Sequence, residues 1–463
     1  MSHRFVFRYA VAMILACLSA TAVAQSGSLR AGAAKVDISP TPNLFPLVDP
    51  IPFINGGEFI DVHDPLWARA LVLDNGVSKV AMISVDSSGI PSSDELIKTI
   101  SSELKIPTAN VILIESRDHN TPWTESQSNG QRAKTPYAAI LERGIVEAAR
   151  KANASLQPAQ AGFGVGKTNV DMERPNWPSD QTVSVLLIAK PSGEPIAIYS
   201  SYAAHPVVMF RALTKEGRPE ISADLAGATS NYVEAQFKGA VAIWNMSATG
   251  ASGSGTPSPV ANLNFSPRPP EARNIGAAGW TKLDAQGSRL GEEIVRVTQS
   301  IKHTESRAVL WAAQTVLSCP RQTCSEMGPP PDHNQPGQDG RPPQFAGQGP
   351  GQQPGQPGQN GQPGPGEPGR GPNQWMGNEK INIPVSLIMI NDIAVTGIAA
   401  DVNIDSGLHL RHDSIFSHNM LVTWMPTDVG NIRVATAIEP ALIDAVVKMQ
   451  KSYLPIWQAA SKQ

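Results

Sequence analysis

The chain has 463 residues, a formal net charge of −3 at neutral pH and an isoelectric point near 6.3. No basic run stands out, which argues against a nucleic-acid-binding surface, so we expect no nucleic-acid partner. A chain of this length ordinarily forms two or three domains.

Residues 1–24 have the pattern of a secretory signal peptide. Two arginines precede a short apolar core, and the small-residue cleavage motif Ala-Val-Ala ends at residue 24. No later segment approaches the roughly 18 uninterrupted apolar residues of a membrane-spanning helix. We therefore expect a soluble protein that is secreted or periplasmic. In such a compartment the two cysteines that remain, Cys319 and Cys324, predict a small local disulfide.

Residues 25–327 alternate between strand-like and helix-like runs, which is typical of βαβ units with a buried sheet. The strand-like runs lie at 67–76, 79–86, 110–116, 184–190, 196–206 and 240–248, and the helix-like runs at 92–104, 137–152, 224–237 and 283–303. This order predicts an α/β fold with a largely parallel or mixed sheet and helices on both faces.

The segment 328–372 consists almost entirely of Pro, Gly and Gln, a composition that predicts a disordered insertion. Residues 373–463 then continue the α/β pattern. They contain a predicted strand hairpin over 381–401 and a helix over 439–450. The two blocks are therefore predicted to be one α/β domain that the insertion divides.

Reactive side chains follow three of the predicted strands. Arg117, Asp118 and His119 follow one, His205 follows another, and the third runs into a loop of small and hydroxyl residues. Ligands bind beyond the carboxyl ends of strands in open α/β sheets, so these groups are expected to converge. Two such histidines can bind a metal or a reacting carbonyl group. His63, which precedes a strand, is a further catalytic candidate.

Several motifs carry a family resemblance. They are AGAAKVDISP, VHDPLWARALVLDNG, ISVDSSG, SSYAAHPVVM, SADLAGATSNYVEAQF and VAIWNMSATGASG. Together they resemble the N-terminal catalytic domain of the neutral/alkaline (non-lysosomal) ceramidases and their shorter bacterial relatives. The resemblance runs from about residue 30 to about residue 455, interrupted by the insertion, and does not include the C-terminal immunoglobulin-like domain of the long members. It implies a zinc-dependent amidase.

The resemblance also shows where this chain departs from the family's ligand set. The first histidine ligand of the family falls on Arg117, and its tyrosine ligand falls on Asn431. His205 matches the second histidine ligand, and Asp401 stands where the family has a glutamate. A permanently charged guanidinium cannot ligate a cation and would repel it.

One form of the site keeps a zinc ion. His119, His205 and Asp401 would supply three nitrogen and oxygen ligands and leave an open position for water. Asp118 or His63 would orient or deprotonate that water.

A second form has no metal. Arg117 would supply the positive charge and hold a carboxylate or phosphate, while His119 and Asp118 would act as an acid/base pair. In a third form the site binds a ligand and has no activity.

The family resemblance implies three more candidate site residues. Ser252 and Ser254 flank the position that matches the nucleophilic serine of the family, and both are candidate catalytic residues. Arg174 lies in a segment similar to the family's and, with Arg117, is a candidate for substrate binding.

We predict a hydrolase that cleaves an amide bond in a lipid or another small molecule. The alternative is a non-catalytic or metal-independent member that binds anions or lipids. Either form would take a small-molecule or lipid ligand, with possible peripheral membrane contact, and no protein partner is predicted. A different hypothesis is a matrix or cell-surface protein that acts through residues 328–372.

Overall fold

The computed structural model describes residues 26–48, 58–128, 131–170, 180–209, 218–249, 277–320, 380–424 and 438–462. The fold and the site are built from these residues. The predicted signal peptide, the predicted insertion and Cys324 lie outside them. Among the described helices, none is long and apolar enough to cross a membrane.

The first sheet has five strands in the order β10-β2-β5-β6-β7. Its strands are β2 (Arg30–Asp37), β5 (Trp67–Asp74), β6 (Lys79–Val85), β7 (Val111–Glu115) and β10 (Gln157–Pro158). Helix α2 (Ser93–Leu104) connects the parallel strands β6 and β7, and α3 (Pro136–Ala154) follows β7. The buried residues of α2 recur every four positions, at Leu96, Ile100 and Leu104, so one face of the helix packs on the sheet.

The second sheet has the order β11-β12-β13-β14. Its strands are β11 (Gln160–Lys167), β12 (Thr182–Ala189), β13 (Pro195–Tyr202) and β14 (Val241–Met246). Helix α4 (Asp224–Gln236) connects the parallel strands β13 and β14, and α5 (Ala277–Ser300) follows β14.

The third sheet has the order β16-β17-β18-β19. Its strands are β16 (Leu310–Pro320), β17 (Lys380–Ile390), β18 (Ile393–Ile398) and β19 (His418–Thr423). Helix α7 (Ile404–Asp413) connects the parallel strands β18 and β19, and α8 (Glu439–Ala460) closes the chain. Three short pairs complete the strands: β1 (Gly27–Ser28) with β15 (Arg307–Ala308), β3 (Leu47–Val48) with β4 (Glu58–Phe59), and β8 (Glu125–Ser128) with β9 (Gln131–Lys134).

The three sheets share one plan. In each, two antiparallel pairings are followed by a helix and then by a strand that pairs in parallel with the third strand. Each unit ends in a long helix, which is α3, α5 or α8. The chain therefore repeats one supersecondary unit three times, and each repeat has a pair of parallel strands whose carboxyl ends lie side by side.

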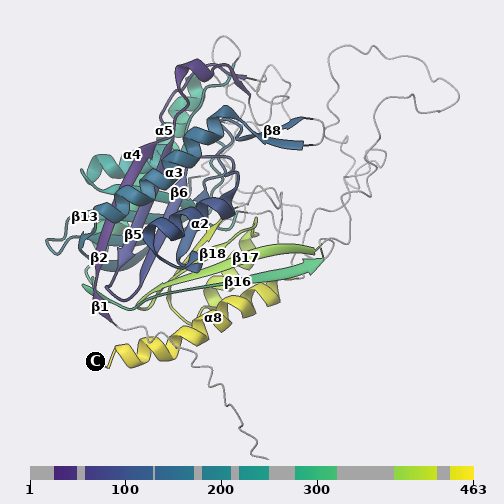
Figure 1. The fold of residues 1–463 in the computed structure, drawn as a ribbon. Helices are drawn as coiled ribbons and strands as arrows, with labels where there is room; N and C mark the ends of the chain where they lie inside the picture. The colour runs from purple at the N-terminus through teal and green to yellow at the C-terminus, as the bar shows by residue number, and fades with distance from the viewer. Residues whose placement is uncertain are drawn as a thin grey trace, which may run out of the picture.

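One hydrophobic core joins the three units. It includes Leu71, Met82 and Ile112 of the first sheet, Leu186, Tyr199 and Ile243 of the second, and Ile388, Val395 and Met420 of the third. The opposite face of each sheet packs against its own helices, as α2 and α3 do on the first sheet (Figure 1). The inner strands β5, β6, β12 and β13 are buried on both faces, which explains their nearly continuous apolar runs.

The predicted mixed α/β class is confirmed. The structure distributes the helices differently from the expectation of one sheet with helices on both faces, because each of three sheets has helices on one face and the shared core on the other. The predicted hairpin over 381–401 is present as β17 and β18, which turn at Asn391 and Asp392.

Candidate active site

The centre of the site is a buried ion pair between residues from two sheets. Arg117 lies just after β7 and Asp401 just after β18, and Nη1 of Arg117 is 3.1 Å from Oδ1 of Asp401. Only 9% of each side chain is exposed. Arg117 has a φ of +62°, a left-handed conformation that is uncommon for a residue with a side chain. Nε of Arg117 is buried and has no hydrogen-bond partner among the described residues.

His205, from the second sheet, contacts the same residue. Its Nε2 lies 3.0 Å from the backbone carbonyl oxygen of Arg117. A carbonyl oxygen can only accept a hydrogen bond, so Nε2 carries the proton in this contact. The imidazole of His205 also meets that of His119 edge to face, with ring centroids 4.8 Å apart. Arg117, His119 and His205 therefore lie together as expected, although they and Asp401 come from three sheets and not from one.

The imidazole of His119 is held in its neutral form. Burial lowers its pKa to about 4, and the positive charge of Arg117 acts in the same direction. At neutral pH this ring is therefore an uncharged group that can accept a proton.

Asp118 has the opposite character. Its side chain is fully buried, and burial raises its pKa well above the usual range, with the nearby Asp224 carboxylate adding to the effect. Oδ1 accepts a hydrogen bond from the backbone N–H of Asn120 at 2.7 Å. Oδ2 is buried without a hydrogen-bond partner among the described residues, so its surroundings favour the protonated form of this carboxyl group.

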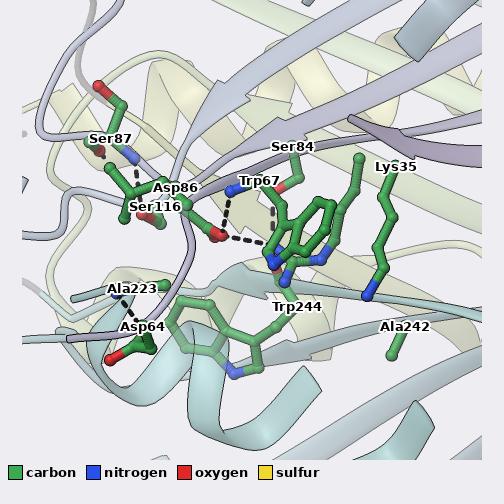
Figure 2. A network of polar contacts seen from close by, with 12 residues as sticks. Lys35, Asp64, Trp67, Ser84, Asp86, Ser87, Ser116, Ala223, Ala242 and Trp244 are labelled. Carbon is green, nitrogen blue, oxygen red and sulfur yellow. Dashed lines mark hydrogen bonds and ion pairs between the residues drawn. The ribbon is translucent and has the colours of Figure 1, made fainter. Parts of the chain in front are cut away.

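Asp86, which lies beside Trp67 in Figure 2, forms a second buried pair with Arg69. Nη1 of Arg69 lies 2.6 Å from Oδ2 of Asp86, which also accepts the backbone N–H of Trp67 at 2.9 Å. Burial nevertheless raises the pKa of Asp86. Sequence reasoning missed this pair. The available signal was a lone arginine in the apolar strand WARALVLD, since a buried charge requires a partner.

His63 has a different set of contacts. Its ring stacks on Trp280 with centroids 3.5 Å apart, and its Nδ1 lies 3.0 Å from Oδ2 of Asp64. The hydrogen bond to Asp64 is the main cause of its raised pKa. The contacts with Trp280 and Asp64 fix the orientation of the ring. The catalytic role of His63 stays a prediction.

Two of the three predicted zinc ligands make other contacts in this structure. Asp401 directs a carboxylate oxygen to Arg117, and His205 directs its Nε2 to the carbonyl oxygen of the same residue. In the part of the chain that the structure describes, no three His, Cys, Asp or Glu side chains are grouped closely enough to hold a metal ion. Zinc binding by His119, His205 and Asp401 thus stays a prediction from the family resemblance.

Four further residues of the predicted site lie outside the described residues. They are Arg174, Ser252, Ser254 and Asn431. Their predicted roles are neither supported nor opposed by the geometry.

The fold is similar to that of solved ceramidase structures. The fold matches the crystal structure of neutral ceramidase from Pseudomonas aeruginosa with a TM-score of 0.60, covering 92% of this chain and 75% of that chain at 16% sequence identity. It matches a ceramidase complexed with C2 with a TM-score of 0.61, covering 92% and 76% at 15% identity. The fold is ceramidase-like. No protein-family model and no curated protein sequence matches the chain. At this identity the likeness concerns the fold alone.

Proposed function

We propose that this protein is a ceramidase-like hydrolase that cleaves an amide bond in a lipid or another small molecule, and that Arg117 replaces a metal ion as its electrophile. The observation that carries the proposal is the buried Arg117–Asp401 ion pair. In the family resemblance both residues stand at ligand positions. Here one of them is a cation that neutralises the other, so the site already has the positive charge that zinc would supply.

The side chains around this pair suit the chemistry of amide hydrolysis. Arg117 would polarise the carbonyl group and stabilise the negative charge that develops on its oxygen. The neutral imidazole of His119 would accept a proton from water as the water oxygen bonds to the carbonyl carbon. As the carbon–nitrogen bond breaks, the leaving nitrogen would take the proton of Asp118. Transfer of the proton from His119 to Asp118, directly or through water, would restore the site.

The predicted location fits a lipid or small-molecule substrate met outside the cytoplasm. We propose export on the basis of the signal pattern in residues 1–24. Peripheral contact with a membrane would give such an enzyme access to a lipid amide.

The test is hydrolysis by the purified mature protein of ceramide and of shorter N-acyl amines in mixed micelles, with the released amine measured by mass spectrometry. We expect cleavage by the wild type and a loss of about 100-fold or more in Arg117→Gln, as for removal of one oxyanion-stabilising group. Arg150→Gln is the matched control, because Arg150 is an exposed arginine paired with Glu103 and Glu147. Equal rates in Arg117→Gln and wild type would exclude the proposed role of Arg117.

A second candidate function is anion or lipid binding without catalysis. It is favoured by the buried Nε of Arg117, which has a hydrogen bond to offer to a carboxylate or phosphate. If no N-acyl amine is cleaved, binding of the wild type to vesicles with anionic lipids, lost in Arg117→Gln and kept in Arg150→Gln, would support this function.

A further inference from the structure

The turn before helix α4 joins the loops that build the site. The backbone N–H of Ser222 donates to the carbonyl oxygen of Asn120 at 3.1 Å, which connects the turn to the loop after β7. The N–H of Ala223 donates to Oδ1 of Asp64 at 2.9 Å, which connects it to the segment before β5 (Figure 2).

Asp224 makes the third connection, to the loop after β13. Oδ1 accepts the backbone N–H of Val208 at 3.0 Å, and Oδ2 accepts the N–H of Met209 at 2.7 Å. Oδ1 also accepts the N–H of Leu225 at 2.6 Å. The carboxylate is completely buried. Charge-assisted bonds of this kind are stronger than bonds between neutral groups.

These bonds fix the chain that carries His205. The N–H of Val207 donates to the carbonyl oxygen of His205 at 2.9 Å, so residues 205–207 form a tight turn after β13, directly before the two amides that Asp224 binds. The carboxylate of Asp224 binds the two residues that follow this turn, and the bond from His205 to the carbonyl oxygen of Arg117 holds its first residue.

We propose that Asp224 is a positioning residue, whose buried carboxylate binds the backbone amides of Val208 and Met209 and thereby sets the place of the His205 imidazole against Arg117 and His119. The proposal rests on the proposed function in one respect, since it assumes that His205 belongs to the working site.

The conformation of Asp224 sets it apart from an ordinary helix-capping residue. It is the first residue of α4, after the N-cap Ala223, and its φ is +46°. A left-handed φ is costly for a residue with a side chain and persists where the surroundings enforce it. Here the conformation turns the carboxylate toward a loop from another part of the chain. Burial raises the pKa of Asp224 to about 6, although three backbone N–H groups bind the carboxylate and act to lower its pKa.

The test compares Asp224→Asn with Asp180→Asn. Asp180 is the control, because its carboxylate is also buried and also accepts a backbone N–H, that of Thr182 at 3.0 Å. It also pairs with Arg411 at 3.1 Å, so Asp180→Asn controls for the general effect of neutralising a buried carboxylate. The readout is the set of imidazole signals in nitrogen-15 spectra, with His205 assigned by a His205→Gln variant. We expect Asp224→Asn to shift the His205 signals or broaden them beyond detection, while the signals of the exposed His412 and His418 stay in place. Asp180→Asn should leave His205 unchanged.

Unshifted His205 signals in a folded Asp224→Asn variant would overturn the proposal. If that variant does not fold, amide hydrogen exchange of the wild type decides. Val208 and Met209 lie outside helices and strands, yet their amides should exchange roughly ten-fold or more slowly than open loop amides. Exchange at the rate of open loop amides would reject the role. Neither readout needs turnover, so a displaced His205 in a protein that hydrolyses no amide would leave this inference standing and reject the proposed function.

Discussion

The guanidinium of Arg117 and the carboxylate of Asp401 lie 3.1 Å apart at the ends of strands that belong to two different sheets. Their side chains are nearly buried, so each charge contributes to the compensation of the other. This pair connects the first repeat of the fold to the third and places a permanent positive charge beside His119 and His205.

The pair should be visible in the free energy of unfolding. Asp401→Asn leaves the charge of Arg117 buried without its partner, and we expect a loss of about 3 kcal/mol, as for other broken buried pairs. The double variant Arg117→Met/Asp401→Leu removes both charges and should recover most of that loss. Urea denaturation of the single and double variants measures both effects. A double variant no more stable than Asp401→Asn would show that the ion pair is not the source of the loss.

Replacement of the buried acid should reduce catalysis more than binding. Asp118→Asn keeps the shape of the side chain and removes the proton that the leaving nitrogen would take. We expect kcat to fall by about 100-fold or more with little change in KM, the range that general acid catalysis contributes. Steady-state kinetics on the best N-acyl amine tests this. A similar kcat in Asp118→Asn and wild type would remove Asp118 from the mechanism.

His119 should make the protein less stable in acid. Its pKa is about 4 in the folded protein and near 6.5 in the unfolded chain, so the unfolded chain binds the proton more readily. Its contribution to stability is therefore present above pH 6.5 and is lost as the pH falls toward 4. Over this window we expect the free energy of unfolding of the wild type to fall by on the order of 2 kcal/mol more than that of His119→Gln. This figure allows for the partly exposed ring. A difference in unfolding free energy between the two proteins that stays constant across the window would contradict a neutral imidazole in the folded protein.

His63 should show the opposite pH dependence. Its pKa is raised by the bond to Asp64, so the folded protein binds the proton more readily than the unfolded chain. The stabilisation is fully present below pH 6.5 and is lost as the pH rises through the folded pKa. His63→Asn should therefore lower the unfolding midpoint more at pH 5.5 than at pH 8.5. A larger effect at pH 8.5 would show that stacking on Trp280, and not the charged contact with Asp64, holds the ring.

Much of the fold follows from sequence patterns. Apolar runs such as VILIE predicted buried strands, and the polar residues directly after them predicted the position of the site. The sequence also contained signals for the convergence of Arg117 and His205, because both follow strands that pair in parallel with a neighbour. By contrast, β11 and β16 were not predicted. Strand β11 reads QAGFGVGK, whose glycines are poor strand formers, and it becomes a strand by pairing along its whole length with β12.

The contacts within the site were less predictable. Asp401 matched a metal-ligand position by family resemblance, and nothing in the local sequence indicates that its partner is Arg117. Asp224 begins the helix-like run 224–237, and the sequence around it does not predict its contacts with Val208 and Met209, because that loop reaches it only in the folded protein. Local patterns predict elements and their ends, whereas pairings between distant loops depend on how the three sheets pack.

The replacement of a metal ion by Arg117 is tested most directly by the zinc content of the purified mature protein. Elemental analysis after incubation with zinc and removal of excess metal would compare wild type with His205→Ala. We expect far less than one zinc per chain in both proteins, with amide hydrolysis by wild type unchanged by a chelator. About one zinc per chain in wild type, lost in His205→Ala, would contradict the role of Arg117 and restore the zinc site of His119, His205 and Asp401.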